Sequence, residues 1–150
     1  MTTYPISGTQ KPATLTITRW LRIGLQAAVG AILAVWLTQI AILALWPELA
    51  TFKPLDSYAR SALFTFIPAM GATAVFAWLT KTQDQPATKF LWIAAGFLLL
   101  SIIPDYLLPI PNRTMVASTA AAFMHLVAGI VTAFLILAGY TRAAKASDKK

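Results

Sequence analysis

The sequence is dominated by four long apolar stretches that carry almost no charge. The stretch 23–45 has no charged residue, and its strongly polar side chains are Gln26, Thr38 and Gln39. As a helix rising ~1.5 Å per residue, it exceeds the ~30 Å hydrocarbon core of a bilayer. Hydrophobic residues make up 58% of the chain and charged residues 11%. A soluble domain of 150 residues could not bury so much apolar surface, so we expect an integral membrane protein.

The apolar stretches are continuous rather than alternating, which predicts helices and not the strands of a membrane barrel. The predicted spans cover about 20–46, 58–79, 90–108 and 115–140. Their connections are short, so consecutive helices should be antiparallel neighbours. The predicted fold is therefore all-α, an integral membrane four-helix bundle with up-down topology. The helix-breaking residues expected at span ends are Pro47 after the first span and Pro104, Pro109 and Pro111 in the third.

The four spans form one transmembrane domain over 19–140, flanked by two polar segments. We expect 1–18 to be a flexible cytoplasmic N-terminal tail and 141–150 to be a basic cytoplasmic tail. The first span is too long for the apolar region of a signal peptide, which predicts that it is not cleaved.

The distribution of basic residues predicts the orientation. An even number of spans puts both termini on one side, and nine of the twelve lysines and arginines fall there, against three on the other side. The positive-inside rule then places both termini in the cytoplasm. Aromatic side chains fall near seven of the eight predicted span ends, where the headgroups lie. They are Trp20, Trp46, Tyr58, Trp78, Trp92, Tyr106 and Tyr140.

The composition excludes several kinds of chemistry. There is no Cys, one His and five acidic residues, so disulfides, thiolate sites and sites with several histidines cannot form within the chain. We therefore expect no catalytic residues, no cofactor and no bound metal, and an enzyme is not expected. The net charge of +7 does not indicate nucleic-acid binding, because the basic residues lie between apolar stretches.

His125 is the first candidate functional residue. It lies about eleven residues into the fourth span, ~16 Å deep at the helical rise, near the depth of Pro68 in the second span. Because Pro68 frees the carbonyl of Phe64, we expect the imidazole to donate a hydrogen bond to it. The functional alternatives are a proton relay, a ligand contact, or an axial ligand to haem or chlorophyll.

Asp105 is the second candidate, placed ~5 Å below the outer boundary by the helical rise. We expect it to pair with Arg60 or Arg113 and so lock two helices, with Gln39 in the same neighbourhood. A lone carboxylate in a transport path is the alternative. Because Asp105 and His125 differ in predicted depth by roughly 10 Å, we do not expect them to touch.

Two segments resemble a known family. The run Leu98–Leu99–Leu100–Ser101–Ile102–Ile103–Pro104–Asp105 and the run Ala121–Ala122–Phe123–Met124–His125–Leu126–Val127–Ala128 are similar to an uncharacterised bacterial family of small four-span membrane proteins, a domain of unknown function. The resemblance covers about 19–140. It implies a multi-pass protein of the bacterial plasma (inner) membrane with four helices and no assigned activity. It also marks Pro104, Asp105 and His125 as residues to test.

Two functions remain open from the sequence. The first is a structural or accessory subunit that binds a membrane-protein partner, a lipid of the bilayer or a second copy of itself. Small residues at helical spacing in the first and fourth spans fit such packing, either within the bundle or between copies. The second is a small transporter or proton-coupled channel that uses Asp105 and His125.

Overall fold

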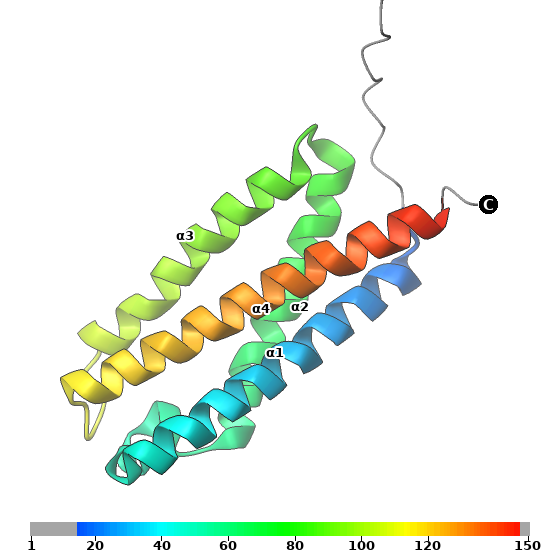
Figure 1. The fold of residues 1–150 in the computed structure, drawn as a ribbon. Coiled ribbons are helices and arrows are strands. Elements are labelled where there is room, and N and C mark those ends of the chain that lie inside the picture. The colour runs from blue at the N-terminus through cyan, green and yellow to red at the C-terminus, as the bar shows by residue number, and fades with distance from the viewer. Residues whose placement is uncertain (1–14, 148–150) are drawn as a thin grey trace, which may run out of the picture.

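The computed structural model describes residues 15–147 and is all-helical over that range. The helices are α1 (Ile17–Leu45), α2 (Tyr58–Thr82), α3 (Pro86–Leu107) and α4 (Met115–Ser147), with two short 3₁₀ helices, η1 (Pro47–Thr51) and η2 (Lys53–Leu55), between α1 and α2. Successive long helices run in opposite directions, as the ribbon in Figure 1 shows. The predicted all-α four-helix bundle is confirmed. All four helices are long and apolar enough to cross a membrane.

Local sequence signals set the helix ends. Pro47 lies two residues beyond the end of α1, and Pro86 occupies the first position of α3, where a proline costs no hydrogen bond. The hydroxyl of Ser57 accepts from the backbone N–H of Arg60 at the start of α2, and that of Thr114 accepts from Ala117 at the start of α4. These side chains satisfy backbone donors that a helix start leaves without partners.

The helices extend beyond the predicted spans at the start of α1, the end of α2, the start of α3 and the end of α4. Pro104 does not break α3 but lies in its last turn, and the Leu108 N–H still bonds the Pro104 carbonyl at 3.0 Å. Pro104 has no N–H to bond the carbonyl of Leu100, and the helix continues past this one missing bond to Leu107. α4 continues through 141–147 of the predicted basic tail, a segment with three alanines, the strongest helix formers.

The predicted N-terminal tail, 1–18, lies outside the described residues up to position 14. Its last residues already belong to the bundle, because Leu15 is buried and α1 begins at Ile17.

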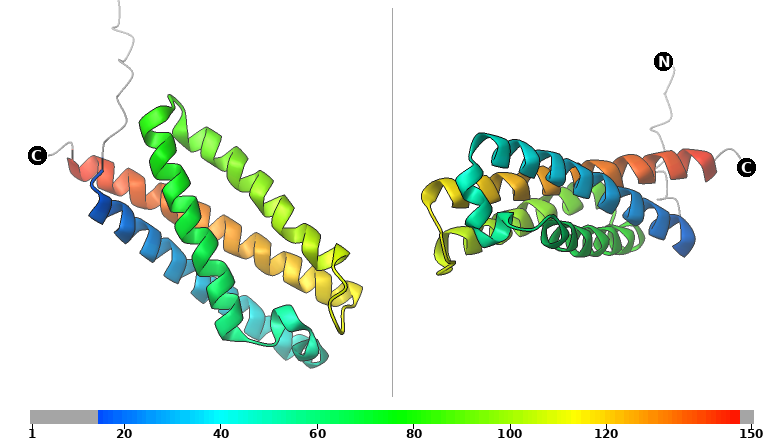
Figure 2. Two further views of the ribbon diagram at one scale, coloured as in Figure 1. Left: turned by 180° about the vertical axis from the view of Figure 1, so that it is seen from behind. Right: turned by 90° about the horizontal axis from the view of Figure 1, so that it is seen from below.

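The bundle has two ends, which we name by their connections. The loop end carries the α1–α2 and α3–α4 connections, and the terminal end carries the start of α1, the α2–α3 connection and the end of α4 (Figure 2). α1 packs along both α2 and α4, whereas α3 lies beside α4 near the loop end and meets α2 near the terminal end.

An aromatic cluster closes the terminal end. The ring of Phe76 in α2 is fully buried, and its centroid lies 5.9 Å from Trp20 of α1, 4.9 Å from Phe90 of α3 and 5.3 Å from Tyr140 of α4. Trp20 also stacks on Tyr140 at 5.6 Å. Each helix therefore contributes one ring to this cluster, which fixes all four relative to one another.

A second core fills the loop end between α1 and α4. The 3₁₀ connection folds inward, so that Leu49, Phe52 and Leu55 are buried against α1 and α4. α3 is attached more sparsely, because its buried residues are only Phe90 near its start and Asp105 near its end.

Glycine permits a close approach of α1 and α4 at Gly139. A Cβ built on Gly139 would lie 3.1 Å from Ile23, whereas one on Gly96 of α3 would meet nothing within 4 Å. Ile23 is β-branched and stiff, so it has little freedom to yield.

We predict that Gly139→Leu lowers the free energy of unfolding by about 1–3 kcal/mol, because the added side chain overpacks the α1–α4 contact. The measurement is unfolding in mixed micelles, followed by helical circular dichroism. The matched control is Gly96→Leu, which should leave stability unchanged or raise it, since leucine favours a helix more than glycine does. Equal losses in both variants would contradict this account.

Candidate functional site

Asp105 of α3 and His125 of α4 face each other across the α3–α4 contact. The imidazole Nε2 lies 3.3 Å from the carboxylate Oδ2. The Asp105 side chain is 8% exposed and the His125 side chain 40%. The sequence-based expectation that these residues lie too far apart to touch is therefore wrong.

The error came from measuring depth along the helix axes alone. In an α-helix each side chain leans toward the helix N-terminus. α3 and α4 are antiparallel, so Asp105 leans away from the loop end and His125 leans toward it. The two side chains thus approach each other and close the axial gap.

A second contact holds Asp105 in place. The hydroxyl of Ser118 in α4 donates a 2.6 Å hydrogen bond to the backbone carbonyl of Asp105. Ser118 and His125 are seven residues apart and so share one face of α4. That face therefore contacts both the backbone and the side chain of Asp105.

The pair is held close without a well-formed hydrogen bond. Oδ2 of Asp105 is buried, and within residues 15–147 it has no hydrogen-bond partner, although Nε2 is at 3.3 Å. A buried carboxylate oxygen without such a bond is costly, so a proton or a small side-chain rotation at His125 would strengthen the contact.

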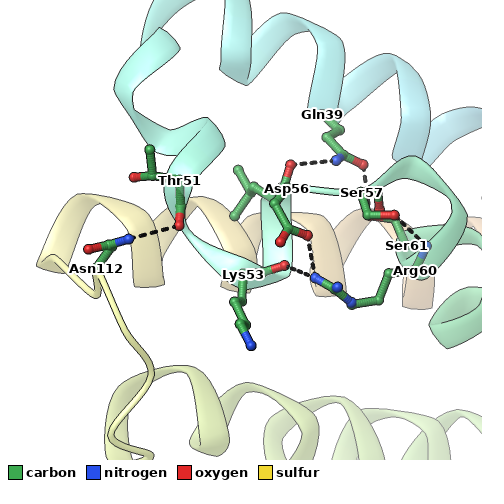
Figure 3. Close-up of polar contacts among 9 residues, drawn as sticks. Gln39, Thr51, Lys53, Asp56, Ser57, Arg60, Ser61 and Asn112 are labelled. Carbon is green, nitrogen blue, oxygen red and sulfur yellow. Dashed lines mark hydrogen bonds and ion pairs between the residues drawn. The ribbon is translucent and has the colours of Figure 1, made fainter.

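Arg60 does not reach Asp105, so that predicted lock is wrong. Its guanidinium pairs with the Asp56 carboxylate and donates to the Lys53 carbonyl, as Figure 3 shows. These partners precede it in the chain, so Arg60 stabilises the 3₁₀ connection and the start of α2. Arg113 is not the partner either, since it donates to the carbonyls of Tyr106 and Leu108 and so caps the end of α3.

Gln39 lies in a different polar contact from the one expected. Its side chain is fully buried, donates a 2.9 Å bond to the Leu55 carbonyl and accepts a 2.8 Å bond from the Ser61 hydroxyl (Figure 3). It therefore ties α1 to η2 and α2. Ser61 and Leu55 were not predicted as partners of Gln39. The signal that could have found the inward fold is the apolar set Leu49, Phe52 and Leu55, spaced three residues apart in the connection.

The expected bond from His125 to the Phe64 carbonyl is absent from the described part of the chain. Pro68 does lie inside α2, but the Phe64 side chain points outward and is exposed. The nearest helices to α4 are α1 and α3, and α2 makes few contacts with it. His125 therefore faces α3 rather than the proline of α2.

The two connections at the loop end are also joined. Asn112 adopts a left-handed backbone conformation with φ of 58°, which asparagine tolerates better than most residues. Its amide donates a 3.1 Å bond to the Thr51 carbonyl in the other connection (Figure 3).

Two recesses lie beside this end of α4. A groove of about 830 Å³ runs between the second half of α1 and the start of α4, and its lining includes Leu37, Ala41 and Phe123. A smaller pocket of about 180 Å³ is lined by Tyr106, Arg113, Thr114, Met115 and Ser118. Met115 lines both recesses, so they adjoin.

No family model, no curated protein and no solved structure matches this chain. Over residues 15–147, no three His, Cys, Asp or Glu side chains gather where they would hold a metal ion. The candidate site therefore consists of the Asp105–His125 pair with Ser118 and the two adjoining recesses.

We predict that Asp105 and His125 are energetically coupled by about 0.5–2 kcal/mol, because removing His125 leaves a buried carboxylate without its neighbour. The measurement is a double-mutant cycle of Asp105→Ala and His125→Ala, with unfolding followed in mixed micelles.

The matched control is a cycle on the exposed pair Asp56 and Arg60, for which a coupling of at most ~0.5 kcal/mol is expected. Additive losses for Asp105 and His125 would mean that their approach contributes nothing to stability.

Proposed function

We propose that this chain is a multi-pass protein of the bacterial inner membrane, with both termini cytoplasmic, and that it acts as an accessory subunit that binds a lipid or a membrane partner. The observation that carries this proposal is the groove between α1 and α4, an apolar recess on the outside of the bundle. Its volume falls in the ~300–1,000 Å³ range of ligand sites.

The use of the buried polar side chains supports the same proposal. Gln39 and Ser61 bond each other and the backbone, and Thr65 and Thr73 bond carbonyls of their own helix. Such bonds hold helices together and leave few groups to line a water-filled path. Large exposed apolar side chains on all four helices fit a bilayer as the surroundings.

The resemblance to four-span proteins of unknown function remains a prediction, and it assigns no activity. The proposed orientation rests on the excess of lysine and arginine at the terminal end.

The orientation is open to a direct test, because the chain contains no cysteine and a single introduced thiol has no background. A membrane-impermeant maleimide should label Lys53→Cys at the loop end in intact cells. It should label Lys145→Cys at the terminal end only after permeabilisation. Gly96→Cys in the middle of α3 should resist labelling in both conditions. Labelling of both lysine positions from the same side would overturn the four-span arrangement.

A second function is favoured by one observation, the 3.3 Å approach of Asp105 to His125. An acid and a histidine at this distance can exchange a proton, and ionisable groups inside membrane helices often carry protons or ions. A small proton-coupled transporter or channel using this pair is therefore the alternative proposal.

Proton flux into liposomes that hold the purified protein separates the two functions. With an imposed pH gradient and a pH dye inside, an accessory subunit should give the flux of empty liposomes. A proton-coupled protein should give a flux above that level, abolished by Asp105→Asn and kept by the control Gly96→Ala. A flux of the second kind would reject the accessory role in favour of the alternative.

A further inference from the structure

The groove between α1 and α4 is apolar throughout. Its polar lining residues are Thr38 and Thr119, and their hydroxyls donate to the Ala34 and Met115 carbonyls of their own helices. The Thr119 hydroxyl also accepts a 3.3 Å bond from Tyr106, so neither hydroxyl is left unpaired in the groove. Exposed Ala41 contributes a small side chain to the lining, beside large ones such as Trp46 and Phe123. An occupant of this groove must therefore be a hydrocarbon.

The length of the groove identifies the kind of hydrocarbon. On α1 it extends from Leu37 to Trp46, about 14 Å at the helical rise, which is half of the ~30 Å hydrocarbon core. Toward the terminal end the two helices close up, and a Cβ on Gly30 would meet Leu135 at 2.4 Å. This length matches one acyl chain from one leaflet, which reaches only to the middle of the hydrocarbon core.

The adjoining pocket offers hydrogen-bond donors and a positive charge. Nη1 of Arg113 donates to two carbonyls of α3, which leaves the other guanidinium N–H groups for a ligand. The Thr114 hydroxyl accepts from the Ala117 N–H, and within residues 15–147 it donates to nothing. No described carboxylate lies within ion-pair distance of Arg113. The pocket is thus complementary to an anion with several oxygens.

We propose that these two recesses form one site for an anionic phospholipid of the leaflet at the loop end. The phosphate lies at Arg113 and Thr114, and one acyl chain passes Met115 and runs along the groove toward the middle of the bundle. This inference deepens the proposed function, on which it rests, by naming the class of ligand. Trp46, at the mouth of the groove, lies at the level where indole rings favour the headgroup region.

The test is native mass spectrometry of the full chain in detergent, with equal amounts of phosphatidylglycerol and phosphatidylcholine as probes. The wild-type chain should retain one lipid and prefer phosphatidylglycerol about fivefold, the factor that corresponds to ~1 kcal/mol for one basic residue. Arg113→Gln should bring the preference to about one, and Arg113→Lys should keep most of it. Lys53→Gln removes an exposed charge at the same end and should change nothing.

The acyl-chain half of the site is tested by Ala41→Trp, which fills the groove from an exposed position and should abolish retention of both lipids. Gly96→Trp on α3 is the matched control and should retain them. Helical circular dichroism shows that each variant is folded, and Arg113→Gln still tests the site if Ala41→Trp does not fold.

An unchanged preference for phosphatidylglycerol in Arg113→Gln would overturn the proposed site. A wild-type dimer that Ala41→Trp dissociates would also overturn it, because the groove would then hold a second copy of the chain. Neither result would affect cysteine labelling or proton flux, so failure of the lipid site is distinguishable from failure of the accessory role.

Discussion

The placement of all four helices depends on the fully buried ring of Phe76, which contacts one aromatic ring from each of the other three helices. Aromatic pairs of this kind contribute about 0.5–1.5 kcal/mol each beyond their buried area. With the terminal end fixed in this way, the lateral position of α3 depends on what holds its opposite end. That end is held by Asp105 against Ser118 and His125, and by the Tyr106 hydroxyl, which donates a 3.3 Å bond to Thr119 of α4. The candidate site is therefore also a structural joint.

The Asp105–His125 pair is thus both a candidate functional site and a contact between two helices. The pair joins α3 to α4 because the Asp105 carboxylate and the His125 imidazole approach within 3.3 Å, while the Ser118 hydroxyl bonds the Asp105 backbone. The adjoining recesses lie on the same first turns of α4 that contact α3. A ligand bound in these recesses and the contact with Asp105 would therefore both depend on where the N-terminal turns of α4 lie.

The sequence predicted the four helices well, because uncharged apolar runs and flanking prolines are local signals. It failed where the outcome depended on three-dimensional detail. The Asp105–His125 contact was missed because residue counting ignores the lean of side chains along antiparallel helices. The partners of Gln39 were missed because the connection between α1 and α2 was treated as a polar link, although Leu49, Phe52 and Leu55 stand three residues apart in it.

α4 has 33 residues and is longer than the bilayer that the chain is proposed to span. At ~1.5 Å per residue the helix is about 50 Å long, well beyond the ~30 Å hydrocarbon layer. With the proposed orientation, its final turns project into the cytoplasm as a rigid rod bearing Arg142 and Lys145. The guanidinium of Arg19 bonds the hydroxyl of Ser147, which braces this rod against α1. Such a rod would hold positive charge at a fixed height above an anionic leaflet.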